Sequence, residues 1–396
     1  MPERLTAEQR RIARGDAVAL TQALVRIDSR NPSLVDTGPG EQEAADTLGR
    51  VLEDWGFAVE LTLAAPGRPN VIARMGPCDT PALMFAGHLD IVATEGMTHA
   101  PFDADARDGR VYGRGSTDMK SGVAAMCAAA TLAFDFAPKP NRQIVIAAVA
   151  DEEYESLGMR AMLASGVSAE MAIVTEPTRL AICPAHRGFV WIEIEFSGRA
   201  AHGSRYEIGI DAVRHAGLVL AELDELDREP LTRIVHPLLG RASLHAGTIQ
   251  GGIGMNTYPD ACRLTLERRT LPGESPDAAM REVHEACERV RGRRPELDVR
   301  IRLTLAQYPS DVDVNSPVVG MLKGALVAEA MPVRVEGMSA WTDAALLNEA
   351  GIPAICFGPG DITLAHANEE FVSISEINSA TRVLTRVARD WLLEPS

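Results

Sequence analysis

The chain has 396 residues, of which 46% are hydrophobic and 24% charged, and its formal net charge is −16. At roughly 100–200 residues per domain, this length predicts two or three globular domains. The acidic balance argues against a protein that binds nucleic acid, whose phosphates need a basic face, and against binding to anionic membranes.

The N-terminal sequence MPERLTAEQRRIARGD contains no apolar segment of the kind that a secretory signal needs. The most apolar stretch, residues 121–136, is shorter than the roughly 20 residues that span a membrane, so we expect a buried helix there. The six cysteines are scattered without a C-x-x-C pair, which predicts reduced and mostly buried thiols. We therefore expect a cytoplasmic protein with no membrane partner.

Regular elements are predicted along the first and last thirds of the chain. Helices are expected over 6–27 and 41–55, with the turn-rich sequence DSRNPSLVDTGPG between them. Short apolar runs, separated by helical stretches at 121–135, 157–165 and 316–330, follow at 70–75, 82–92, 144–150, 171–177 and 352–360. Continuous apolar strands that alternate with helices are typical of an α/β sheet covered on both faces.

The middle third has a different rhythm, with strands that alternate between apolar and polar residues. The predicted elements are a strand at 189–196, a helix at 208–226, strands near 242–250 and 261–269, a helix at 276–291 and a strand through 297–303. This β-α-β-β-α-β order is the split βαβ, ferredoxin-like pattern of an α+β domain. We therefore predict an inserted domain at 187–306 within a larger α/β domain formed by 1–186 and 307–396.

Side chains that bind metals follow several of the predicted strands. His88 ends one apolar run, Glu153 and Glu176 follow two others, and Asp118 and His366 lie in loops. Sites in open α/β sheets form beyond the carboxyl ends of the strands, so we expect these five side chains to meet. Two imidazoles and three carboxylates suit a pair of divalent ions, and a carboxylate can bridge two ions.

Two further carboxylates support this prediction. Glu152 and Glu153 are adjacent, so that one can accept a proton from a metal-activated water while the other binds metal. Asp90 lies two residues after His88 on an extended strand and so points the same way, where it can orient the imidazole. Each motif alone is common in ordinary loops, and the prediction depends on their convergence. No metal role is assigned to the remaining histidines that lack carboxylate neighbours at a strand end, which are His99, His186, His215, His236, His245 and His284.

The motifs resemble the metallopeptidase M20 family, the group of acetylornithine deacetylase, succinyl-diaminopimelate desuccinylase, aminoacylase and glutamate carboxypeptidase. The matching stretches, in family order from about residue 85 to 371, are GHLDIV, YGRGSTDMKSG, ADEEYESLG, VTEP, GRAAHGS, GGIGMNTYPD, RRTLPGE and FGPGDITLAHANEEFV. The resemblance implies a zinc-peptidase-like catalytic domain, with a mixed sheet covered by helices, and an inserted lid that forms a homodimer.

The resemblance also implies roles in the metal site. His88 and Glu176 would hold one zinc, Glu153 and His366 the second, and Asp118 would bridge both. Asp90 would stand behind His88, Glu152 would be the general base, and the Asp118–Met119 peptide would be cis. Zinc is expected, while cobalt and manganese suit the same ligands.

For the substrate, the resemblance implies residues on the lid and one loop of the catalytic domain. His202, which a partner subunit often supplies in this family, would stabilise the oxyanion. Asn256 and Arg269 would hold the substrate, with Arg269 on its carboxylate and Arg268 as the rival for that role. The loop from Gly358 to Gly360 would offer backbone N–H groups to the same carboxylate.

The expected activity is hydrolysis of an amide bond in an N-acyl amino acid or a similar small carboxylate. A carboxypeptidase and an N-carbamoyl amino acid amidohydrolase are the neighbouring alternatives. A more distant alternative is a non-catalytic metal-binding protein. The presence of Glu152 speaks against it, because a protein that only binds metal needs no unliganded base. A nucleotide-binding protein is disfavoured, because the loop GRGSTDMKSG does not match G-x-x-x-x-G-K followed by Ser or Thr.

Overall fold

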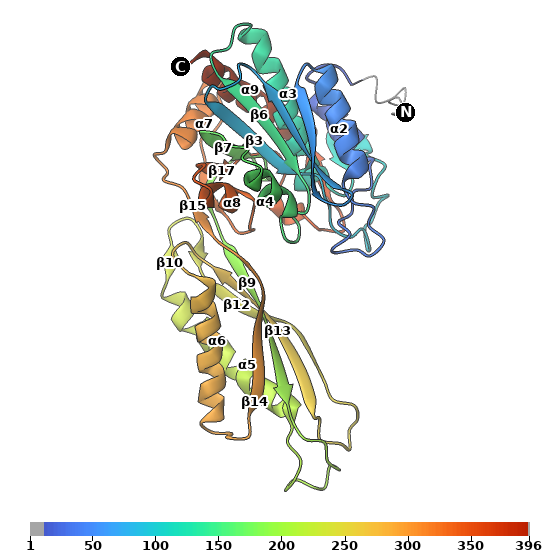
Figure 1. Cartoon of the computed structure of the whole chain (residues 1–396), viewed down its shortest axis with the longest axis vertical. Helices are drawn as coiled ribbons and strands as arrows, with labels where there is room; N and C mark the ends of the chain where they lie inside the picture. Colours follow the sequence, from blue (N-terminus) through green and yellow to red (C-terminus); the bar gives the residue numbers. More distant parts are fainter. Residues whose placement is uncertain (1–11, 395–396) are drawn as a thin grey trace. The chain divides into compact units, whose positions relative to one another are not determined.

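The computed structural model describes residues 12–394 of the chain (Figure 1). These residues divide into two compact units, of which the second consists of Ala185–Asp311 and Gly337–Trp341 and the first of the remainder. The segment 337–341 lies outside the range predicted for the inserted domain. Within the described residues, no helix is long and apolar enough to cross a membrane.

A mixed β-sheet, most of whose strands belong to the first unit, forms the centre of that unit. The strands occur in the order β1-β2-β6-β3-β7-β17-β8-β15, with β16 beside β8. β3, β6, β7 and β17 run parallel, whereas β1 and β2 are antiparallel. The bounds are β1 (Ala58–Ala65), β2 (Arg68–Met75), β3 (Ala82–His88), β6 (Gln143–Val149), β7 (Met171–Val174), β8 (Ile182–His186), β15 (Ser310–Asp311), β16 (Val335–Met338) and β17 (Ala354–Cys356). The mixed α/β fold is therefore as predicted.

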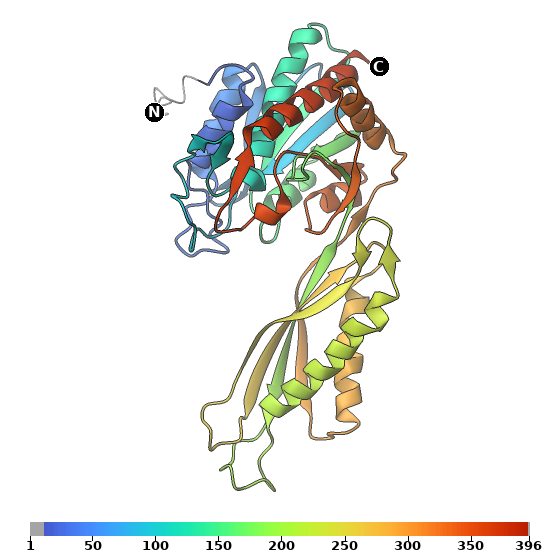
Figure 2. The ribbon, with the colours of Figure 1, turned by 180° about the vertical axis from the view of Figure 1, so that it is seen from behind.

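Helices cover both faces of this sheet. α3 and α9 pack together over one face, and α4 and α8 lie on the other (Figures 1 and 2). The helices are α1 (Ala17–Val25), α2 (Gln42–Asp54), α3 (Ser121–Phe136), α4 (Leu157–Ala164), α7 (Pro317–Ala328), α8 (Ala344–Glu349) and α9 (Ile374–Leu393). A small sheet is formed by β4 (Ala106–Arg107), β5 (Arg110–Tyr112) and β18 (Phe371–Ser373).

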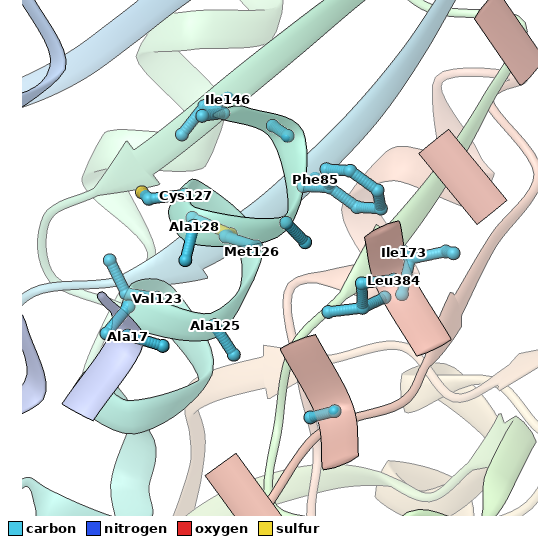
Figure 3. Packing of buried hydrophobic residues seen from close by; sticks show 14 of the residues in the cluster. Ala17, Phe85, Val123, Ala125, Met126, Cys127, Ala128, Ile146, Ile173 and Leu384 are labelled. Carbon is cyan, nitrogen blue, oxygen red and sulfur yellow. The ribbon is translucent and has the colours of Figure 1, made fainter. Parts of the chain in front are cut away.

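The Ala-rich stretch that starts at residue 121 is a buried helix, as predicted. α3 packs against both the sheet and α9, so that Val123 and Met126 lie in one apolar core with Phe85 and Leu384 (Figure 3). Small alanine side chains let the helices approach closely, and burial of their apolar area stabilises the fold.

The first helix is shorter than the predicted 6–27. Residues 6–11 lie outside the described part of the chain, and α1 begins only at Ala17. The reason is local. Gly15 has a φ of +80°, and the carboxylate of Asp16 accepts the N–H of Ala19 at 3.0 Å as a helix N-cap.

The second unit contains a four-stranded antiparallel sheet in the order β12-β13-β9-β14. Its main elements are β9 (Gly188–Ser197), α5 (Ala212–Arg228), β12 (Ser243–Gly251), β13 (Ala261–Thr270), α6 (Pro276–Arg291) and β14 (Asp298–Gln307). Val190, Ile192, Ile194 and Phe196 alternate along β9 and pack against α5 and α6. Short strands β10 (Val235–His236) and β11 (Gly240–Arg241) form a hairpin.

Candidate metal and catalytic site

Four of the predicted metal ligands meet at the carboxyl ends of the central strands. His88 is the last residue of β3, and its Nε2 lies 3.2 Å from Oδ1 of Asp118. Nε2 of His366 lies 3.5 Å from the other oxygen, Oδ2 of Asp118, and 3.1 Å from Oε2 of Glu153. Ligand atoms of His88, Asp118 and Glu153 all lie within 4.8 Å of one another. Asp118 thus offers one oxygen to each imidazole, which is the arrangement of a bridging carboxylate.

Two more carboxylates are buried against this cluster. Glu176 follows β7 and is 3% exposed, and its Oε1 has no hydrogen-bond partner among the described residues. Burial, together with the negative charge of Asp118, raises the pKa of Glu176 well above its usual range. Oε2 of Glu152 lies 3.9 Å from Nε2 of His88, and burial likewise raises the pKa of Glu152. Carboxylates crowded in a buried site need a positive charge, so these residues fit divalent ions.

The imidazoles respond to the same crowding. Burial opposes a charge on His88, but hydrogen bonds to Asp118 and Asp90 outweigh it and raise the pKa of His88 well above its usual value. Burial also opposes a charge on His366, but Asp118 and Glu153 raise its pKa to about 11. The raised pKa values mean that protons on these rings can offset the carboxylate charge. Metal ions would displace those protons, since a ligating imidazole must be neutral.

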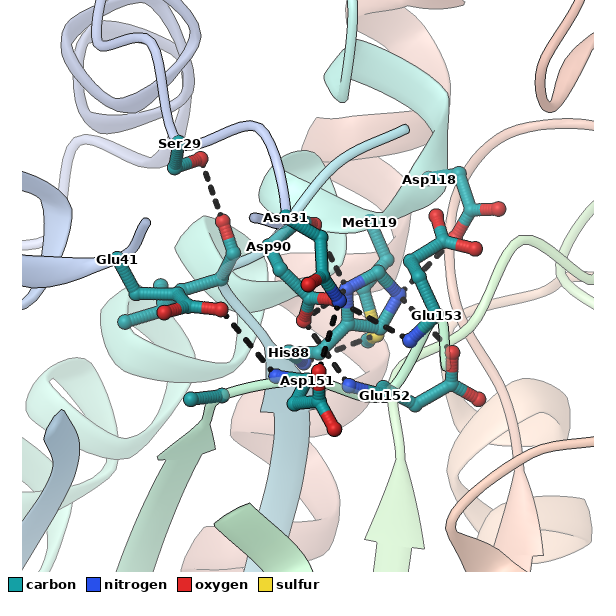
Figure 4. A network of polar contacts seen from close by, with 12 residues as sticks. Ser29, Asn31, Glu41, His88, Asp90, Asp118, Met119, Asp151, Glu152 and Glu153 are labelled. Carbon is teal, nitrogen blue, oxygen red and sulfur yellow. Dashed lines mark hydrogen bonds and ion pairs between the residues drawn. The ribbon is translucent and has the colours of Figure 1, made fainter. Parts of the chain in front are cut away.

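Asp90 anchors both a predicted ligand and the predicted base (Figure 4). Its side chain is fully buried, and Oδ1 lies 3.5 Å from Nδ1 of His88. Oδ1 accepts the N–H of Glu152 at 3.1 Å, and Oδ2 accepts the N–H of Glu153 at 3.2 Å. The sequence predicted the first contact but not the second. Asp90 therefore fixes the turn after β6 as well as the imidazole.

A buried ion pair holds the loop that carries Asp118. The Asp118–Met119 peptide is cis, as the resemblance implies. Oε1 of Glu370 accepts the N–H groups of Thr117 at 3.0 Å and of Asp118 at 3.2 Å. Its Oε2 lies 2.7 Å from Nη1 of Arg114. The same Nη1 donates at 3.2 Å to the carbonyl of Ala367, the residue after His366. No role was predicted for Glu370, although it lies in the quoted motif AHANEEFV.

The prediction for the loop from Gly358 to Gly360 is wrong. The N–H of Gly358 donates to Oγ1 of Thr178 at 3.1 Å, and the N–H of Gly360 donates to Oε2 of Glu376 at 2.7 Å. Pro359 between them has no N–H. All the donors of this loop are thus used inside the protein, and none is left for a substrate carboxylate.

His202 and Asn256 belong to the second unit and lie on neighbouring segments. The N–H of Gly203 donates to the carbonyl of Asn256 at 2.7 Å, and His202 forms a bridge with Thr257. His202 is exposed, and its Nδ1 lies 2.8 Å from Oγ of Ser204. The roles of His202 and Asn256 remain predictions.

The two adjacent arginines of β13 have different surroundings. Arg268 is 1% exposed and is held by Glu274 at 2.5 Å and Glu282 at 3.0 Å. Arg269 is partly exposed and donates from Nε to Glu267 at 2.5 Å. Because Arg268 is committed to two carboxylates in the core of its unit, it is not free to bind a substrate. Of the two, Arg269 remains the candidate.

Some polar groups near the site were not found from the sequence. Asp343, the residue before α8, is 2% exposed. Burial raises the pKa of Asp343 to about 7. Its negative charge also adds to the rise in the pKa of Glu152 and Glu176. Asn31 is fully buried behind Asp90. Nothing in the sequence WTDAALL or DSRNP marked either residue.

Comparison with known proteins agrees with this geometry. Residues 84–390 match the model of Peptidase family M20/M25/M40. The chain is 30% identical over 346 residues to acetylornithine deacetylase of Myxococcus xanthus, which covers 85% of this chain and 88% of that one. It is also 30% identical over 379 residues, 94% of this chain and 98% of the other, to a Mycobacterium tuberculosis protein provisionally named succinyl-diaminopimelate desuccinylase DapE.

The fold has counterparts among solved structures. The Bacillus subtilis protein YXEP, described as a dinuclear metal-binding peptidase of the M20 family, superposes with a TM-score of 0.71 at 16% identity. The superposition covers 98% of this chain and 99% of that one. At this identity the likeness concerns the fold alone.

Proposed function

The chain belongs to Peptidase family M20/M25/M40, and from this premise we propose that it hydrolyses the amide bond of a small N-acyl amino acid with the help of two divalent ions. That it is an amidohydrolase follows from the family and from relatives named for deacetylation and desuccinylation. The acyl group, the amino acid and the ions are the proposed part.

The donor set supports a pair of ions at this site. His88 and Glu176 would hold one ion, Glu153 and His366 the other, and Asp118 would contribute one oxygen to each. We propose zinc, which accepts imidazole and carboxylate ligands, with cobalt or manganese as substitutes. When bound, such ions lower the pKa of a water molecule and offset negative charge on a carbonyl oxygen.

Glu152 is the residue of the chain that would move the proton. Its side chain is 10% exposed and lies close to His88, and Asp90 holds its main chain. A desolvated carboxylate is a stronger base than a carboxylate in water. We propose that Glu152 takes the proton of the attacking water and returns it to the leaving amine.

Residues of the second unit would bind the rest of the substrate. We propose that Arg269 pairs with the substrate carboxylate, that Asn256 hydrogen-bonds nearby, and that His202 stabilises the oxyanion. The exposed position of His202 is compatible with a group that another subunit supplies. A carboxypeptidase is the second candidate, because the family description names peptidases.

The observation that carries the proposal is the position of Asp118 between two imidazoles, with Glu152 beside His88. The test is a panel of N-acetyl, N-succinyl and N-carbamoyl amino acids and dipeptides, offered to zinc-loaded protein and to the same protein after chelation. We expect hydrolysis of an acyl amino acid that depends on zinc. Tight zinc binding without hydrolysis of any member would favour a metal-binding protein instead.

We also propose a homodimer formed through the second unit. Several large apolar side chains in its loops are exposed, namely Tyr206, Ile208, Ile253 and Met255. Exposed apolar side chains of this size are frequent in protein interfaces. Sedimentation analysis should give twice the mass of the chain, and Ile253→Asp with Met255→Asp should give the monomer. We place the protein in the cytoplasm, where its six unpaired cysteines would stay reduced.

A further inference from the structure

We propose that Asn31 is a positioning residue of the catalytic site, an inference that rests on the proposed function. Its side-chain amide links Asp90 and Asp151, the two carboxylates that fix the turn bearing Glu152 (Figure 4). Asn31 precedes the family match, which begins at residue 84. The N-terminal segment would thus contribute to catalysis without touching the substrate.

The amide of Asn31 is held in one orientation. Nδ2 donates to Oδ2 of Asp90 at 2.8 Å and to Oδ1 of Asp151 at 3.0 Å. Oδ1 accepts the N–H of Ser33 at 2.9 Å and Nη2 of Arg68 at 3.1 Å. A guanidinium can only donate and a carboxylate can only accept, so the amide cannot be reversed. Every hydrogen-bonding position of this fully buried side chain is used.

The two carboxylates hold opposite ends of the turn that follows β6. Asp151 begins this turn with a φ of +67°, in the left-handed region that costs energy for a residue other than glycine. Asp90 accepts the main-chain N–H groups of Glu152 and Glu153. Asp151 accepts those of Glu155 and Leu157. A shift of either carboxylate would therefore move the proposed base and a proposed ligand together.

The charges of the network explain why an amide is needed between these carboxylates. Arg68 supplies the guanidinium of the network. It donates hydrogen bonds to Glu41 at 2.5 and 2.6 Å and to Asp151 at 3.0 Å. Asn31 therefore donates to Asp90 without adding a charge and separates it from Asp151. A carboxylate at position 31 would add a further negative charge, and an aliphatic side chain would leave two buried acceptors without this donor.

The test compares Asn31→Leu with the unaltered protein and with a control, Asn348→Ala. Asn348 is a partly buried amide of the same unit that bonds the main chain of Ala344 and Ala354. The readouts are zinc affinity by chelator competition, kcat and KM on the best panel substrate, and the unfolding temperature of the metal-free protein. Loss of partners behind metal ligands commonly costs ~10–100-fold in affinity or activity.

We expect Asn31→Leu to lose about that factor in zinc affinity and in kcat, with KM little changed. Asn348→Ala should lose stability only. If Asn31→Leu does not fold, Asn31→Ser, which keeps one donor, is measured in its place. Zinc affinity and kcat within twofold of the unaltered protein in the folded variant would overturn the proposal. If no amide in the panel is cleaved, the proposed function fails, while the zinc affinities still decide the role of Asn31.

Discussion

Replacement of Glu152 by Gln tests the proposed chemistry most directly. The change keeps the shape of the side chain and removes the proton acceptor. Nε2 of His88 is 3.9 Å away, beyond hydrogen-bond distance, and the main chain of Glu152 is held by Asp90 in either case. The variant should therefore keep its fold, and it should keep its zinc because Glu152 is not among the five proposed ligands.

The expected loss of rate follows from the role of a general base. Positioned bases contribute ~10²–10⁴-fold. At about 1.4 kcal/mol per tenfold, this range equals roughly 3–5.5 kcal/mol of transition-state stabilisation. We expect kcat to fall by this factor while zinc content and KM stay close to those of the unaltered protein.

The free energy of unfolding of the metal-free Glu152→Gln variant should rise, whereas its kcat falls. Burial raises the pKa of Glu152 in the folded chain well above its usual value. The stability that this group contributes is therefore present below the pKa of the unfolded chain and is lost as the pH rises through the folded pKa. Gln does not ionise, so the metal-free variant should be at least as stable as the unaltered protein at pH 8. A gain of stability with loss of rate is common at active sites.

The assay measures kcat and KM on zinc-loaded protein, zinc content by atomic spectroscopy, and unfolding temperature after chelation at pH 5.5 and 8. Glu155→Gln is the matched control, because Glu155 is an exposed residue of the same turn. A rate within tenfold of the unaltered protein would refute the role of Glu152 as base. Loss of zinc would instead make Glu152 a ligand.

Three further predictions concern metal removal, the second unit and the loop after β17. Burial raises the pKa of both Asp343 and Glu370 to about 7, so the unfolding temperature of the chelated protein should fall between pH 5 and 8. Added zinc should raise the unfolding temperature more at pH 8 than at pH 5. An unfolding temperature that does not change with pH would contradict this prediction. Arg268→Met removes a buried guanidinium from the partly buried carboxylates of Glu274 and Glu282, and it should cost about 1.5–3 kcal/mol in urea unfolding without a change in KM. A raised KM would instead return Arg268 to the substrate site. In Gly358→Ala, the new Cβ would lie 2.6 Å from the carbonyl oxygen of Glu176 and would displace this proposed ligand. Zinc affinity should therefore fall by about tenfold or more. An unaltered affinity would show that the main chain adjusts to the Cβ without moving the Glu176 side chain.

The adjacent arginines show what strand alternation reveals. Leu264, Leu266 and Arg268 alternate on the buried face of β13, so the sequence already contained a signal that Arg268 points into the core. Arg269 points the other way, and its guanidinium lies 5.4 Å from the ring centre of Phe189. The interpretation of the motif RRTLPGE rested on the resemblance alone and therefore kept Arg268 as a rival of Arg269.

The Gly358 loop shows the opposite case. The resemblance to the M20 family implied that its backbone N–H groups would be free to bind a substrate carboxylate. Of their acceptors, Thr178 is 180 residues from Gly358 and Glu376 is 16 residues from Gly360, and only the folded chain brings them to the loop. Neither periodicity nor composition could have identified these partners.

The sequence by itself determined the α/β class, the buried helix α3 and the residues that end the central strands, because these depend on short-range hydrophobic patterns. Since parallel strands end at one edge of a sheet, that pattern also predicted which side chains would meet. Only the tertiary structure decided that Asn31, Glu370 and Asp343 lie at the same site. Their neighbours are up to hundreds of residues away, and a buried polar group is satisfied by whatever the fold places beside it, which no local pattern encodes.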